Sequence, residues 1–128
     1  MTGFQLLDGA LALLLTDRAL APEYTEYAPG LINMLLAETH GVNNSLRASK
    51  GLEEHGAVQS IASLDDELPC EDELARSALM YGLVAKLIMD DGDMSRVAYF
   101  QNQYVSLCSD AARYVAEAIR DVYAGEGS

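Results

Sequence analysis

The chain has few basic residues, few histidines and few cysteines, and each shortage argues against a class of function. Eight lysines and arginines stand against twenty aspartates and glutamates among 128 residues, so the net charge is −12. A protein that binds exposed phosphates needs the opposite balance, which argues against nucleic acid as the main partner. We therefore expect contacts with other proteins, or with DNA that must pass without adhering.

The two cysteines and two histidines offer little material for catalysis or metal binding. Cys70 and Cys108 lack further cysteines or histidines at metal-ligand spacing, so we expect two reduced thiols that pack in a cytoplasmic protein. A disulfide between them is the alternative. His40 and His55 do not form a zinc-protease motif, and the chain has neither a nucleophile elbow nor a glycine-rich phosphate loop. The sequence predicts no enzymatic activity, no cofactor and no bound metal.

Long apolar runs are also missing. The segment Gly9–Leu15 is much shorter than the roughly 20 residues of a membrane span, and its flanks do not fit a signal peptide. Apolar residues still make up 50% of the chain, which is enough for a core without metal or disulfide. We expect a single helical domain over residues 1–128 that does not associate with a membrane.

The chain does contain the pattern of a helical hairpin. Residues 74–89, LARSALMYGLVAKLIM, are apolar on nearly every face, which is typical of a buried helix. After the acidic turn Asp90–Asp93, apolar residues recur at three- or four-residue steps from Val97 to Val122, which predicts a second helix that covers the first. Gly92 suits a left-handed backbone position.

The expected fold is all-α, a small helical bundle built on a long antiparallel pair at residues 70–90 and 94–122. Asp93 is the expected N-cap of the second helix, which would be roughly 40 Å long and would extend beyond the chain's own core. Shorter helices are predicted at residues 3–16 and 23–38, and Pro29 should either bend the latter or mark its true start.

Helical periodicity fails between His40 and Pro69. A short helix at 43–49 and an extended piece at 57–61 are the only elements expected there. The apolar residues of this segment are too scattered to bury themselves, so we expect residues 41–69 to form an interaction loop that a neighbouring subunit or partner orders. The residues expected at that interface are Asn43, Asn44, Leu46, Arg47, Lys50, Ile61 and Leu64.

Six of the nine residues from Asp65 to Glu73 are acidic. A divalent metal site is one interpretation, but charges at a helix N-terminus and solvated loop residues explain the cluster more simply. The turn Asp90–Asp93 lacks the alternating oxygen ligands and the closing glutamate of an EF-hand. Neither acidic stretch therefore predicts a metal.

Several of these features together resemble one protein family. They are the segment LLAETHGVNNSLRASKG at residues 35–51, the Leu68-Pro69 entry, Tyr81-Gly82-Leu83, the acidic turn, and Tyr99-Phe100-Gln101. The order resembles the small helical head-completion proteins of tailed bacteriophages, also called head–tail connector or adaptor proteins, over residues 31–107. Where such proteins often have Leu-Pro before the Tyr-Gly-Leu, this chain has Leu79-Met80.

The resemblance implies a ring, commonly of twelve copies, that docks on the portal protein and presents a surface to the tail or to a stopper protein. The subunit would then belong to the head–tail junction of the virion, assembled in the cytoplasm of a bacterial host. DNA would only pass through the ring. The wall of the ring should therefore not be cationic, because cationic contacts would retain the DNA. The carboxylates expected to line or rim that channel are Asp65, Asp66, Glu67, Asp90, Asp91 and Asp93. An acidic regulatory or DNA-mimic protein that binds a basic partner is the alternative.

Overall fold

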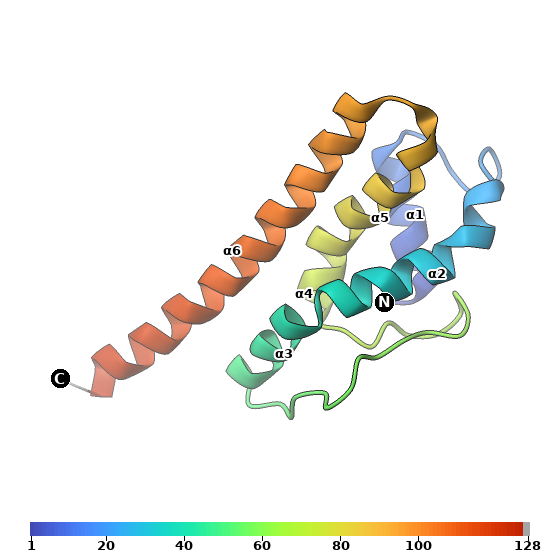
Figure 1. The fold of residues 1–128 in the computed structure, drawn as a ribbon. Coiled ribbons are helices and arrows are strands. Elements are labelled where there is room, and N and C mark those ends of the chain that lie inside the picture. The colour runs from blue at the N-terminus through green and yellow to red at the C-terminus, as the bar shows by residue number, and fades with distance from the viewer. Residues whose placement is uncertain (127–128) are drawn as a thin grey trace.

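The computed structural model describes the backbone of residues 1–126 and the side chains of residues 1–117. All its regular elements are helical, and no β-strand occurs within residues 1–126. The elements are α1 (Gly3–Leu13), α2 (Glu23–Glu38), α3 (His40–Ser49), α4 (Asp72–Leu74), the π-helical turn η1 (Ala75–Leu79), α5 (Met80–Leu87), the 3₁₀ turn η2 (Met89–Asp91) and α6 (Met94–Glu126). The predicted all-α fold is confirmed (Figure 1).

Helix α5 lies at the centre and packs against α1, α2 and α6 (Figure 1). Five of its eight residues are buried, as expected for a helix that is apolar on most faces. Gly82 allows its neighbours to approach closely, because a Cβ there would lie 2.7 Å from Leu35 Cδ2 and 2.9 Å from Tyr104 Cδ1. The Tyr-Gly-Leu motif is therefore a packing motif between α2, α5 and α6.

The acidic turn joins the two arms of the hairpin as the sequence predicts. Gly92 has a φ of 80°, in the left-handed region, and the Asp93 carboxylate accepts a hydrogen bond from the backbone amide of Arg96 at 3.1 Å. Helix α6 then runs for 33 residues, or about 50 Å, and extends well past the other helices (Figure 1). Its predicted apolar face continues to Val115, which is buried; the positions beyond residue 117 lie outside the described side chains.

The bounds of α2 are as predicted, whereas those of α1 and of the first hairpin arm differ. Helix α1 ends at Leu13 and not at residue 16, because the chain turns there and Leu15 adopts a φ of 57°. Pro29 lies within α2, which begins at Glu23. The first arm of the hairpin begins at Asp72 and not at residue 70, with Glu71 as its extended N-cap.

The predicted interaction loop is shorter and better packed than expected. Residues 41–49 belong to α3, and the non-helical segment covers only 50–71, with no strand at 57–61. This loop leaves the end of α3, runs beside α2 and returns to α4 (Figure 1). Ile61, Leu64 and Leu68 are buried in the same core as Leu46 of α3. The expectation that these residues cannot be buried within one chain was wrong, because side chains of α2 and α3 hold the loop in place.

Candidate interaction surfaces

Three asparagines fasten the loop to the helices. The Asn33 side chain exchanges two hydrogen bonds with the backbone of Ile61, at 2.8 and 3.0 Å. The Asn44 side chain exchanges two hydrogen bonds with the backbone of His55, at 2.8 and 2.9 Å. The side-chain oxygen of Asn43 accepts a hydrogen bond from the backbone amide of Glu71 at 2.7 Å. Each amide side chain thus satisfies loop backbone groups that would otherwise lack partners.

Glu71 joins the end of the loop to α3 through ion pairs. Its carboxylate oxygens lie 3.1 Å from Nη1 of Arg47 and 2.8 Å from Nζ of Lys50, and Lys50 also forms an ion pair with Glu73. The hydrogen bonds to Glu71 and Glu73 raise the pKa of Lys50, and the bond from Lys50 lowers the pKa of Glu73. The positive charges of Arg47 and Lys50, two of the predicted interface residues, are therefore compensated within the chain.

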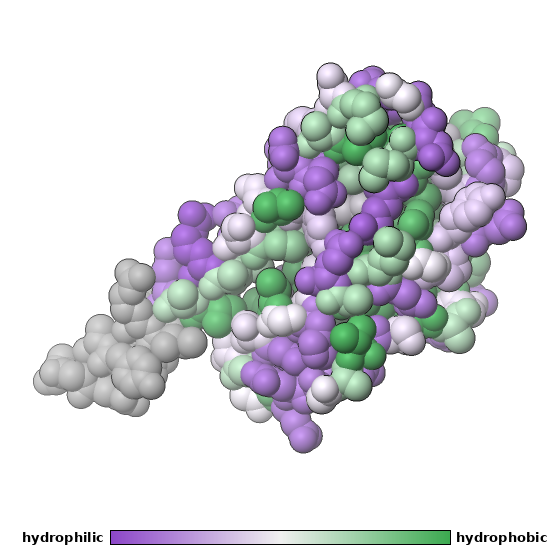
Figure 2. Space-filling model, viewed as in Figure 1, coloured by the Kyte–Doolittle hydropathy of each residue, from purple (hydrophilic) through white to green (hydrophobic). Residues whose placement is uncertain are grey.

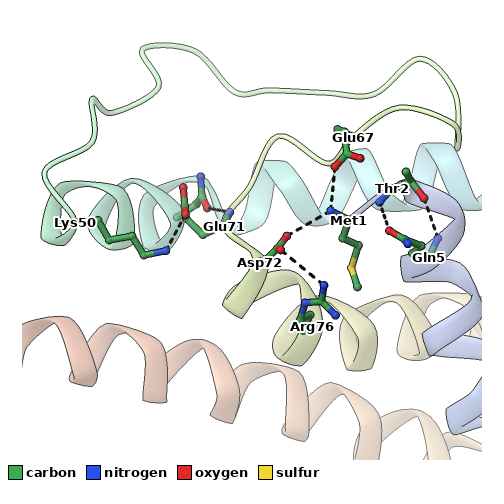
Figure 3. A network of polar contacts seen from close by, with 9 residues as sticks. Met1, Thr2, Gln5, Lys50, Glu67, Glu71, Asp72 and Arg76 are labelled. Atoms are coloured by element: carbon green, nitrogen blue, oxygen red, sulfur yellow. Dashed lines mark hydrogen bonds and ion pairs between the residues drawn. The ribbon is translucent and has the colours of Figure 1, made fainter.

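The N-terminus is fixed by the same stretch of chain (Figure 3). The Met1 ammonium lies 2.9 Å from a Glu67 carboxylate oxygen and 3.5 Å from one of Asp72, and Asp72 also pairs with Arg76 at 3.8 Å. The hydrogen bond to Glu67 is the main cause of a raised pKa for this ammonium. A short antiparallel bridge between Thr2 and Glu67 continues the contact.

The structure places most of the predicted interface residues inside contacts of this chain. Asn43, Leu46, Ile61 and Leu64 are buried. The side chains of Asn44, Arg47 and Lys50 bond to the loop or to α4, with Lys50 keeping 40% of its side-chain surface exposed. A role of these residues in partner binding stays a prediction, and in this conformation only their exposed parts are available for it.

The histidines and Cys70 meet at a small cavity between α3 and the loop. It measures about 10 Å³, room for at most one water molecule, and Nδ1 of His55 has no hydrogen-bond partner among the described residues. Burial raises the pKa of the Cys70 thiol to about 12 and also raises that of Cys108, so both thiols stay protonated at neutral pH. Both cysteines are free, and no group of three potential metal ligands occurs within the described residues.

The six carboxylates expected at a channel do not form one cluster. Four are engaged locally. Asp65 accepts a hydrogen bond from the Ser63 hydroxyl at 3.4 Å, and Asp66 accepts hydrogen bonds from the amides of Ala62 and Ser63. Glu67 binds the N-terminus, and Asp93 caps α6. The carboxylates fall into one group at residues 65–67 and another at residues 90–93. Glu67 lies at the start of α1, whereas the other end of α1 lies beside Asp91, so about 16 Å of helix separates these groups. Any channel role would have to involve the two groups separately.

A groove beside the acidic turn combines aromatic and acidic residues; we call it the tyrosine groove. It has a volume of about 400 Å³ and is lined by Glu23, Tyr24, Tyr27, Leu31, Lys86, Leu87, Asp90 and Asp91. Burial raises the pKa of the Tyr24 hydroxyl, with smaller contributions from the nearby Asp91 and Glu23 carboxylates. Periodicity alone did not reveal this groove, because one wall comes from α2 and the other from the end of α5 and the hairpin turn.

A second groove follows α6, where Leu46, Glu73 and Ser77 face Leu107, Asp110, Ala111 and Tyr114 across about 440 Å³. Tyr114 and Val105 on α6 are 66% and 52% exposed. Figure 2 shows hydrophobic residues along the seam between α6 and the other helices, with hydrophilic residues on its outer side. We call this the α6 groove.

No protein-family model, no curated protein and no solved structure matches this chain. None of the helices within residues 1–126 is long and apolar enough to cross a membrane.

Proposed function

We propose that this protein is a structural virion subunit, one copy of a head–tail connector ring that docks on a portal protein and joins the capsid to the tail. Its partners would be the portal protein, a tail or stopper protein and further copies of itself, with DNA passing through the ring. The activity is assembly, without catalysis, cofactor or metal.

The observation that carries the proposal is the long helix α6. Its backbone runs for about 50 Å and extends past the ends of the other helices (Figure 1), and Val115 is the last buried residue on it among the described side chains. Tyr114 leaves a large apolar surface exposed at the α6 groove, and Val105 leaves another at a separate hollow that Val42 and Tyr104 also line. Apolar surface beside a groove is typical of protein–protein contacts. When successive copies contact each other through two different surfaces, they form a ring if the rotation between neighbouring copies returns to the first copy.

Net charge supports the same function. Six of the seven basic side chains that the structure describes pair with carboxylates of the same chain, and further carboxylates among the described residues have no basic partner. The chain as a whole keeps a net charge of −12. A negative wall repels DNA phosphates and lets the duplex move. An acidic regulatory protein or DNA mimic remains the second candidate, because Glu23, Asp90 and Asp91 gather unpaired at one end of the molecule.

Sedimentation velocity on purified protein tests the proposal. The wild-type chain should associate into one large species, and Tyr114→Glu should return it to a monomer, because a carboxylate replaces an exposed aromatic ring at the contact. Leu20→Glu is the matched control, since Leu20 is 76% exposed but lies between α1 and α2. Equal behaviour of the two variants, or a wild-type monomer at every concentration, would reject the α6 contact.

A further inference from the structure

We propose that the tyrosine groove binds a positively charged segment of a different protein, in which an arginine or lysine stands next to an apolar side chain. The inference goes beyond the proposed ring, because it concerns another surface and does not require self-assembly.

The shape of the groove fits one long side chain with an apolar neighbour. Its volume of about 400 Å³ is within the range of small-ligand sites. Leu31 and Leu87 give it apolar walls, and Tyr27 keeps 62% of its surface exposed. A guanidinium or ammonium group that lies over the Tyr27 ring would gain a cation–π interaction while its methylene stem covers the leucines.

The rim of the groove carries a net negative charge. Glu23, Asp90 and Asp91 make no ion pair and no side-chain hydrogen bond with the described residues, whereas Lys86 is neutralised by Glu38 at 2.8 Å. Arg96 lies in the adjoining hollow with Glu23 and Asp91 and offsets part of this charge. Three carboxylates against this single arginine leave a site that attracts cations.

The charge inventory of the chain argues that the cation comes from another protein. Seven of the eight basic residues have described side chains, and six of these already pair with carboxylates of the same chain: Arg18, Arg47, Lys50, Arg76, Lys86 and Arg113. The seventh is Arg96, which itself faces the groove region. The pairs spread over the surface, so a second copy would bring mainly negative charge to an already negative site.

Amide-shift NMR of the full chain at low ionic strength tests the inference. The probe is a short synthetic peptide that carries arginines flanked by leucines, and its control is the same peptide with neutral citrulline at the arginine positions. The arginine peptide should shift the amides of residues 23–31 and 86–91, and the citrulline peptide should bind at least about fivefold more weakly.

Two paired variants locate the site. Asp90→Asn with Asp91→Asn should weaken binding by roughly fivefold, whereas Glu53→Gln with Glu54→Gln removes the same charge from the exposed loop and should leave the affinity unchanged. Tyr27→Ala should weaken it by roughly twofold to fivefold. Because all these side chains are exposed, the variants should keep the wild-type circular dichroism spectrum.

The remaining outcomes overturn the inference. Equal weakening by both double variants would show attraction by net charge alone, and equal binding of the two peptides would show an apolar site without charge selection. Shifts at the α6 groove would place the site elsewhere. Self-association that Asp90→Asn with Asp91→Asn abolishes would assign the tyrosine groove to a second copy of this chain.

Discussion

Replacing Leu83 by alanine should remove a large part of the stability of this fold. The side chain is fully buried in α5, which α1, α2 and α6 surround. Gly82 beside it already brings Leu35 and Tyr104 to their closest approach, so the neighbouring helices have little freedom to collapse into the space left by the leucine. We therefore expect a loss near the upper part of the usual range for such changes, about 4 kcal/mol.

Urea unfolding followed by circular dichroism measures this loss, and thermal unfolding should show a midpoint lower by about 15 °C. Leu20→Ala is the control, since that side chain is 76% exposed and its truncation should change the free energy of unfolding by less than about 0.5 kcal/mol. A loss below about 1 kcal/mol for Leu83→Ala would mean that α5 is not the centre of the core.

Three further predictions concern the loop, a thiol and the acidic turn. Asn33→Ala should release the loop, so the Ile61 amide, whose donor bond to Asn33 is 2.8 Å, should lose protection in hydrogen exchange by at least about tenfold, while retained protection would refute the role of this clamp. Burial raises the pKa of Cys70 to about 12, so the contribution of this thiol to the free energy of unfolding should be fully present below pH 9. It should fall as pH rises toward 12, by up to about 4 kcal/mol. Urea titrations of wild type and Cys70→Ser at these pH values check it, and parallel curves would contradict it. Changing Asp90 and Asp91 to lysine should leave the fold intact and make the assembled protein bind DNA in a salt-dependent manner, measured by fluorescence anisotropy; absence of DNA binding would argue against a channel position.

The hairpin and its turn could be predicted because their signals are local. A change from all-round to one-faced apolarity identifies a central helix and a covering helix, and Gly92 and Asp93 carry the expected turn conformation and cap. These features depend on neighbours three or four residues away, which a sequence pattern contains directly.

The anchoring of the loop could not be predicted in the same way. Asn33 bonds Ile61 and Asn43 bonds Glu71, each pair 28 residues apart, and no periodic signal connects such positions. The two asparagines at 43 and 44 did stand out as polar residues in an otherwise featureless segment, but the sequence suggested partner contacts, whereas the structure shows both bonded within the chain. Asn33 was missed because a single polar residue within a helix is usually a solvated one.

The tyrosine groove illustrates the same limit. Tyr24 and Tyr27 belong to the helix predicted at residues 23–38, and Asp90 and Asp91 belong to the predicted turn. Their meeting depends on how α2 crosses the hairpin. Helix crossing is set by side-chain packing over the whole interface, which a one-dimensional pattern does not contain.

Electron microscopy of the purified protein, combined with native mass measurement, tests the central claim most directly. A connector subunit should form closed rings with a central opening and a single mass that is a multiple of 13.8 kDa, twelve copies according to the family resemblance. Monomers or dimers at all concentrations, or open filaments without closure, would contradict the ring and favour an acidic regulatory protein.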